Sequence, residues 1–318
     1  MSETHEKIVI IGSGPAGLTA AWELAKGGFA VTVFESLSVP GGMLRTGIPS
    51  HRLPKYVVDA EIDAIKALGV EILTDTTVDK AFFDGLIAGE EYEAVFIATG
   101  AFVSRRLRIE GEDLPGMVSA LDILQQYNMT DSAPVGKNVV VIGGGNVATD
   151  AAGAALRCGA EQVRLFCLED RSAMPAHEWE IAEIAAEGVE LNPAWGPRAI
   201  LSKDGKLTGI QVVKCTSVLD ESGRFAPVYD EKSLQDIPAD MVITAIGQSP
   251  DLRFLSEGIG TYRGTVQVDP YTMETNLPGV FAGGDAVAGT ASLIEAITAG
   301  KTAAQSIMRY IERGPEKP

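Results

Sequence analysis

The sequence is poor in the residues that build redox and metal centres. It contains three cysteines and three histidines among 318 residues, and Cys158, Cys167 and Cys215 stand far apart with no C-x-x-C pair. This spacing excludes a disulfide framework, an iron–sulfur cluster held by the chain alone and a dithiol redox centre. We expect each cysteine to be a small buried side chain, and we expect no metal site.

Basic residues and long apolar runs are also scarce. There are 26 Lys and Arg against 43 Asp and Glu, a formal net charge of −17. So acidic a chain lacks the basic face that binds a phosphate backbone or an anionic membrane surface, which excludes nucleic acid as a partner. No stretch approaches the roughly 18 apolar residues of a membrane span, and the start of the sequence does not have the basic, then apolar, pattern of a signal peptide. We therefore expect a cytoplasmic globular protein with no membrane insertion.

Glycine is plentiful, with 35 residues, and it is concentrated in two similar segments. IVIIGSGPAGLTA (residues 8–20) returns as VVVIGGGNVATDA (residues 139–151). Each segment is a β-branched apolar run, a glycine cluster and a small-residue helical stretch, which is the strand–turn–helix opening of a dinucleotide-binding unit. The sequence therefore predicts an α/β protein with two Rossmann-like, three-layer dinucleotide-binding domains.

The first glycine motif predicts one dinucleotide site. Its first glycine permits a tight turn, its second lets a pyrophosphate approach the backbone, and its third allows close helix–strand packing. The next strand, AVTVFE, ends in an acidic residue that can accept hydrogen bonds from ribose hydroxyls. The predicted site comprises Gly12, Gly14, Pro15, Ala16, Gly17 and Glu35.

The second motif, Gly143-x-Gly145-x-x-Ala148, predicts a nicotinamide dinucleotide site with Asn146 and Val147 at the helix start. The following strand ends at Glu169. A carboxylate there would accept a hydrogen bond from a free 2′-hydroxyl and repel a 2′-phosphate, which favours NAD(H). Arg171, two residues later, leaves NADP(H) open, and a solvated strand-end acid is the alternative role for Glu169.

Two further segments resemble those of known flavoproteins. TNLPGVFAGGDAV (residues 275–287) resembles the second flavin fingerprint of flavoproteins with two dinucleotide-binding domains, and this resemblance implies FAD, with Asp285 on its ribityl chain. ATG at residues 98–100 and AIG at residues 245–247 resemble the crossover strands of that superfamily. The resemblance assigns to FAD the residues Val78, Ala98, Thr99, Gly100, Gly284, Asp285, Ser292 and Leu293, and to the nicotinamide dinucleotide Ile246 and Gly247.

GGMLRTGIPSHRLPK (residues 41–55) is more particular, because it closely resembles the flavin loop of the glutamate synthase small (β) subunit family. Relatives of that family include the electron-donating half of dihydropyrimidine dehydrogenase and the NADPH-binding subunit of ferredoxin:NADP transhydrogenase. Gly42, Leu44 and Arg52 match positions that contact the flavin or its phosphates there, although Arg52 could also be an ordinary surface charge. The resemblance covers about residues 7–311.

Two departures from that family affect the expected function. Its usual members begin with a helical domain whose cysteines bind iron–sulfur clusters, and here the first predicted strand starts almost at once, so we expect that domain to be absent. Many NADPH-using members carry two arginines where this sequence has Leu168 and Glu169.

We therefore predict an FAD-binding domain at residues 1–116 and 249–318, with an NAD(P)-binding domain at residues 117–248 inserted into it and a linker at residues 134–136. The expected function is that of an electron-transfer subunit in which FAD exchanges hydride with NAD(H), or with NADP(H), and electrons with an iron–sulfur partner subunit. The protein would supply binding and alignment, with no catalytic side chain. The direction of electron flow stays open. A free-standing NAD(P)H diaphorase or oxidase and a non-catalytic flavoprotein scaffold or redox sensor are the alternatives.

Overall fold

The chain forms two compact units. In the computed structural model, which describes residues 6–314, the first unit comprises Met1–Arg45, Ser50–Val103 and Gln248–Pro318. The second comprises Thr46–Pro49 and Ser104–Gly247, so its sequence interrupts that of the first. Residues 1–5 and 315–318 of the predicted FAD domain lie outside the described residues.

Apart from the short segment Thr46–Pro49, the chain passes between the two units at β5 (Val103–Ser104) and at the start of β14 (Gln248–Ser249), and these two strands form a two-stranded sheet. The sequence placed these crossings at residues 116/117 and 248/249. The assignment of FAD to one unit and of the nicotinamide dinucleotide to the other stays a prediction.

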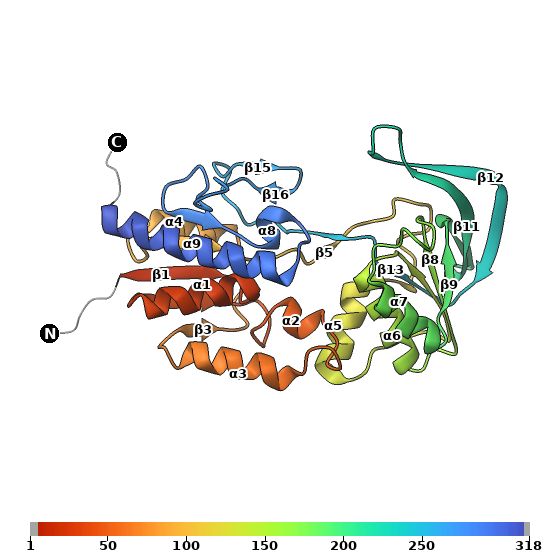
Figure 1. The fold of residues 1–318 in the computed structure, drawn as a ribbon, viewed down its shortest axis with the longest axis horizontal. Helices are drawn as coiled ribbons and strands as arrows, with labels where there is room; N and C mark the ends of the chain where they lie inside the picture. Colours follow the sequence, from red (N-terminus) through yellow and green to blue (C-terminus); the bar gives the residue numbers. More distant parts are fainter. Residues whose placement is uncertain (1–5, 315–318) are drawn as a thin grey trace. The chain divides into compact units, whose positions relative to one another are not determined.

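A five-stranded parallel sheet forms the centre of the first unit, in the order β17-β4-β1-β2-β3. This order is the one expected when a strand–turn–helix motif opens a dinucleotide-binding fold. Its strands are β1 (Lys7–Ile11), β2 (Ala30–Phe34), β3 (Glu71–Leu73), β4 (Ala94–Ile97) and β17 (Val280–Ala282). Two of these strands, β1 and β3, are labelled in Figure 1.

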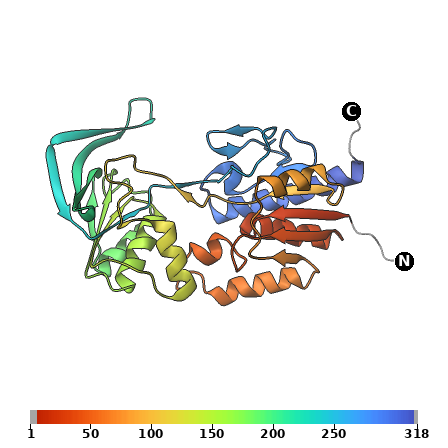
Figure 2. The ribbon, with the colours of Figure 1, turned by 180° about the vertical axis from the view of Figure 1, so that it is seen from behind.

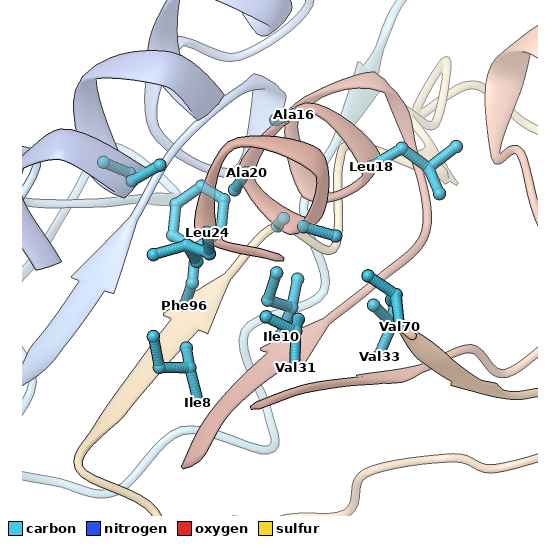
Figure 3. Close-up of a cluster of buried hydrophobic side chains, with 14 of the residues drawn as sticks. Ile8, Ile10, Ala16, Leu18, Ala20, Leu24, Val31, Val33, Val70 and Phe96 are labelled. Carbon is cyan, nitrogen blue, oxygen red and sulfur yellow. The ribbon is translucent and has the colours of Figure 1, made fainter. Parts of the chain in front are cut away.

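Both faces of this sheet are buried, which explains why β1 is apolar from Ile8 to Ile11. Ile8 and Ile10 belong to the core cluster on one face, and Val9 and Ile11 to the cluster on the other. Figure 3 shows the first of these clusters, with Ile8 and Ile10 beside the helix that carries Leu24. A continuous apolar run is thus the sequence signature of a strand covered on both sides.

Helices cover the sheet of the first unit, and two of them pack very closely. A Cβ on Gly300 would overlap the carbonyl oxygen of Ala16, so only glycine allows α9 to lie this near α1. A further two-stranded sheet, β15 (Thr261–Tyr262) and β16 (Thr265–Val266), belongs to the same unit. The helices are α1 (Pro15–Lys26), α2 (Met43–Thr46), α3 (Lys55–Lys66), α4 (Lys80–Ala88), α8 (Asp285–Ala288) and α9 (Leu293–Arg313).

The second unit repeats the parallel-sheet plan, in the order β6-β13-β7-β8-β9. Its strands are β6 (Met117–Ser119), β7 (Asn138–Ile142), β8 (Gln162–Cys167), β9 (Glu190–Pro193) and β13 (Met241–Thr244). One face carries α5 (Ala120–Thr130), α6 (Asn146–Arg157) and α7 (Glu178–Ala186).

The other face of this sheet is covered by an antiparallel sheet of β10 (Trp195–Lys203), β11 (Lys206–Leu219) and β12 (Phe225–Pro238). Val140 and Ile142 pack there against Ile210 and Val212. The far part of the β11–β12 hairpin projects from the rest of the second unit as a green-to-cyan arm, visible from both sides (Figures 1 and 2). The parallel sheets and their covering layers confirm the predicted α/β fold.

Several elements differ from the sequence-based expectation. The flavin loop predicted at residues 41–55 contains the short helix α2, and the expected linker at residues 134–136 lies inside the second unit, between α5 and β7. Within residues 6–314, no helix has both the length and the apolar character needed to cross a bilayer.

Candidate dinucleotide-binding sites

The first glycine turn joins β1 to α1 and is shaped by two close approaches. A Cβ on Gly12, whose φ is +104°, would overlap the Ala98 carbonyl oxygen, and one on Gly17 would overlap the Gly12 carbonyl oxygen. Gly14 is different, because a Cβ there would meet nothing within 4 Å. Gly12 and Gly17 therefore allow the turn to form, while Gly14 leaves an open approach to the backbone at the N-terminus of α1, which begins at Pro15.

Glu35 follows β2 and holds this turn in place. It is only 5% exposed, and its carboxylate accepts hydrogen bonds from the amide N of Ser13 (3.1 Å), the Ser13 hydroxyl and the amide N of Leu37 (2.8 Å). These hydrogen bonds hold the carboxylate in one orientation beside the glycine turn. Sequence reasoning missed Ser13, whose place between the first two glycines was the available signal.

The predicted flavin loop lies against the same turn. The amide N of Gly41 donates to the Ser13 hydroxyl over 3.0 Å, and a Cβ on Gly42 would stand 2.8 Å from the Gly14 Cα. Leu44 packs on the core cluster that contains α1, and Arg52 lies partly buried in the turn before α3. The loop is thus held against the backbone of the first glycine turn.

The Asp285 segment also comes close to the start of α1. A Cβ on Gly284 would stand 2.9 Å from the Ala16 Cβ, so this glycine permits the approach. Asp285 opens α8, and burial raises the pKa of its carboxyl above the ordinary value. Ser292 caps α9 in a capping box with Glu295, and Leu293 follows it with 42% of its surface exposed.

The remaining residues predicted for FAD divide into two groups. Ala98, Thr99 and Gly100 follow β4, where the Thr99 hydroxyl is buried and has no hydrogen-bond partner within the described part of the chain. Val78 instead packs in the core cluster with Phe83, away from the α1 face of the sheet. An orphaned hydroxyl beside an open glycine turn fits a site that receives a polar ligand.

The second glycine turn, between β7 and α6, repeats the geometry of the first. A Cβ on Gly143, whose φ is +143°, would overlap the Ala245 carbonyl oxygen, and a Cβ on Gly145 would meet nothing within 4 Å. Asn146 begins α6, and Val147 packs beside the core cluster of that face. This turn also offers an open backbone at a helix N-terminus.

The end of β8 lies next to this turn. A Cβ on Gly144 would stand 3.2 Å from Oε2 of Glu169, so the carboxylate lies over the middle of the glycine cluster. Arg171 forms a two-point ion pair with Glu178, at 2.8 Å and 2.5 Å. Sequence reasoning missed Glu178, whose signal was an acidic residue seven positions after the arginine.

The AIG segment follows β13 at the same edge of the sheet. Ile246 packs in the core cluster that faces the antiparallel sheet, and the carbonyl oxygen of Gly247 accepts a hydrogen bond from the amide N of Arg105 over 3.0 Å. Because the carboxyl ends of parallel strands meet at one edge, the glycine turn, Glu169 and Gly247 come together there.

Two cysteines of the second unit, Cys167 and Cys215, are buried and unreactive. Burial raises the pKa of Cys167 to about 12 and also raises the pKa of Cys215, so both thiols stay protonated at neutral pH. Within residues 6–314, no three His, Cys, Asp or Glu side chains are grouped to hold a metal ion.

Comparison with known proteins identifies the family. Residues 6–305 match the family described as pyridine nucleotide-disulphide oxidoreductase. The β subunit of NADP(+)-dependent formate dehydrogenase of Moorella thermoacetica is 45% identical, over 98% of this chain and 45% of the relative. A putative NADPH glutamate synthase small chain of Cereibacter sphaeroides is 36% identical, over 97% of this chain and 78% of the relative. The chain spans about half the length of the first of these relatives.

The solved structures confirm the fold. Mycobacterium tuberculosis FprA in complex with NADPH aligns with a TM-score of 0.81 and 21% identity, over 97% of this chain and 85% of that chain. At this identity the likeness concerns the fold alone. The family match and the sequence relatives show that the chain belongs to the pyridine nucleotide-disulphide oxidoreductase family, in the branch that contains the glutamate synthase small chains.

Proposed function

We propose that the chain is an electron-transfer oxidoreductase subunit, with FAD bound in the first unit and a nicotinamide dinucleotide in the second. The observation that carries this proposal is the repeated glycine turn. Gly14 and Gly145 each face open space at a helix N-terminus, while Gly12 and Gly143 each pack against a neighbouring strand end. Two such turns in one chain support two dinucleotide sites.

The residues of the first unit fit FAD. The open backbone at Gly14 would receive the pyrophosphate, Glu35 would accept from the ribose and Asp285 would accept from the ribityl chain. The flavin loop would close over them, because Gly41 and Gly42 hold it against the glycine turn. When bound, FAD supplies exchange of a hydride with nicotinamide and exchange of single electrons with iron–sulfur carriers.

The nicotinamide substrate is proposed as NADP(H), with NAD(H) as the second candidate. The names of the relatives support NADP(H), since the Moorella protein is named for NADP(+) and the Cereibacter protein for NADPH. Glu169 supports NAD(H), because its carboxylate lies over the glycine turn and would repel a 2′-phosphate. Arg171, two residues after Glu169, carries a positive charge that could form an ion pair with a 2′-phosphate.

We also propose that the electrons pass to or from an iron–sulfur partner subunit. The relatives named above are a β subunit and a small chain, that is, parts of larger enzymes. A free-standing diaphorase or oxidase, and a scaffold or redox sensor without turnover, are the competing readings. They differ in whether turnover needs a partner and in whether hydride is exchanged at all.

A rapid-mixing experiment tests the proposal. The purified chain is loaded with FAD, mixed without oxygen with NADPH or NADH, and followed through the visible absorption of the flavin. Rapid bleaching by either nucleotide is the expected result, and the faster one identifies the substrate. A chain that takes up no flavin, or a bound flavin that neither nucleotide bleaches, would contradict the proposed oxidoreductase. Isolation of the native protein with an iron–sulfur protein tests the partner.

A further inference from the structure

Arg171 and Glu178 close a short loop beside the second glycine turn. Both guanidinium Nη atoms of Arg171 donate to the two carboxylate oxygens of Glu178, at 2.8 Å and 2.5 Å. A planar guanidinium binds a carboxylate and a phosphate through the same two-point geometry. The surface of Arg171 that would grip a 2′-phosphate is therefore already engaged by a side chain of the same unit.

The loop between these two residues is fixed to the glycine turn. The amide N of Ala176 donates to the Gly144 carbonyl oxygen over 2.9 Å, and the amide N of His177 donates to Oδ1 of Asn146 over 3.2 Å. Arg171 also lies two residues after Glu169, whose carboxylate stands over Gly144. The ion pair thus lies at the end of β8, where the adenosine ribose of a dinucleotide is bound in this fold.

We propose that Glu178 is a specificity-determining residue of the nicotinamide dinucleotide site, because it competes with a 2′-phosphate for the guanidinium of Arg171. This inference rests on the proposed function, since it requires a dinucleotide at the second glycine turn. A nucleotide with a free 2′-hydroxyl needs no such cation and leaves the ion pair intact. A 2′-phosphorylated nucleotide must draw Arg171 away from Glu178 or share it.

The ion pair is suited to this competition because it is exposed. The side chains of Arg171 and Glu178 are 41% and 76% exposed, so solvent screens their attraction and a phosphate can displace the carboxylate. Arg171 holds the pKa of Glu178 below its ordinary value, so Glu178 remains an anion at neutral pH. The pair therefore weakens the binding of a 2′-phosphate without abolishing it.

A binding experiment separates this role from a structural one. The probes are 2′,5′-ADP and 5′-AMP, which differ in the 2′-phosphate, and their dissociation constants are measured by calorimetry on the FAD-loaded chain. Glu178→Gln should lower the dissociation constant of 2′,5′-ADP by about 2- to 5-fold and leave that of 5′-AMP unchanged. Arg171→Gln should weaken 2′,5′-ADP alone, and in the Arg171→Gln background Glu178→Gln should have no effect.

Glu161→Gln is the matched control. Glu161 forms an exposed ion pair with Lys137 at 2.6 Å, and it precedes the start of β8, whereas Glu169 follows its end. The control removes the same charge at the opposite end of the strand, so it should change neither dissociation constant. Thermal unfolding of each variant checks that the fold is retained.

Each result has a definite meaning. Equal effects of Glu178→Gln on both probes, no effect on either, or an equal effect from Glu161→Gln would overturn the competition. The competition would also be overturned if every variant bound 2′,5′-ADP no more tightly than 5′-AMP. If neither probe binds the wild-type chain and neither NADPH nor NADH bleaches its flavin, the proposed function itself fails.

Discussion

Gly12 lies so close to Ala98 that a Cβ on the glycine would overlap the alanine carbonyl oxygen, and Gly143 stands in the same relation to Ala245. In both units the first residue of the glycine turn thus packs against the end of the neighbouring parallel strand. The two segments share sequence, strand order and this close approach. The two motifs therefore resemble each other in packing as well as in sequence.

This packing predicts that Gly12→Ala and Gly143→Ala destabilise the protein strongly. Each substitution combines a positive φ with a steric overlap, for a loss of about 3 kcal/mol or more in the free energy of unfolding. Gly28→Ala is the control, because Gly28 has a similar φ of +91° and a Cβ there would meet nothing within 4 Å. Its expected loss is about 1 kcal/mol. Equal losses from all three variants in denaturant unfolding would show that the overlap does not matter.

Asp285→Asn is predicted to separate flavin binding from stability. Burial raises the pKa of Asp285 in the folded state, with the Glu295 charge adding to this and a hydrogen bond from the backbone of Ala291 opposing it. As pH rises, the carboxyl of the unfolded protein ionises before that of the folded protein. The flavin-free protein therefore loses stability between the unfolded-state pKa and the raised folded-state pKa, and it stays less stable at higher pH. Asparagine has no charge, so the Asp285→Asn variant does not lose stability in this way.

At neutral pH the flavin-free Asp285→Asn protein should therefore melt at the same temperature or a few degrees higher than the wild type. Its FAD affinity should fall about tenfold, because a charge-assisted hydrogen bond to the ribityl chain is lost. Calorimetric melting and fluorescence titration with FAD measure the two effects. A variant that melts lower and binds FAD as tightly as the wild type would contradict both parts.

Glu169 is predicted to oppose NADP(H). Removing its charge in Glu169→Gln should raise kcat/KM for NADPH relative to NADH by about tenfold, since a carboxylate near a 2′-phosphate costs on the order of 1–4 kcal/mol. Steady-state assays with an artificial electron acceptor give both values. An unchanged ratio would mean that Glu169 is only a solvated strand-end residue.

The sequence predicted the elements that bury a regular apolar pattern. β1 and β7 were expected because their apolar runs, IVII and VVVI, are covered on both faces. β12 was not, because most of its residues are exposed and charges replace the apolar alternation of a half-buried strand. α5 and β10 were also missed. The Gly/Pro-rich composition of residues 36–54 concealed α2, a single turn of helix.

The candidate site was predictable where a motif fixes the backbone and not where side chains meet across loops. The positions of Gly12 and Gly143 follow from their spacing alone. The hydrogen bonds of Glu35 with Ser13, and the ion pair of Arg171 with Glu178, depend on how separate segments fold onto the turns. Spacing along the chain carries little information about such contacts.

The central claim is that the two glycine turns bind two different dinucleotides, and Gly14→Ala and Gly145→Ala test it most directly. Both residues have negative φ, −71° and −94°, and neither Cβ would meet a protein atom within 4 Å, so both variants should fold normally. We expect Gly14→Ala to lose FAD. We expect Gly145→Ala to keep its flavin and to lose bleaching by NADPH and NADH. A Gly145→Ala protein that loses its flavin, or a Gly14→Ala protein that keeps it with full affinity, would contradict the account.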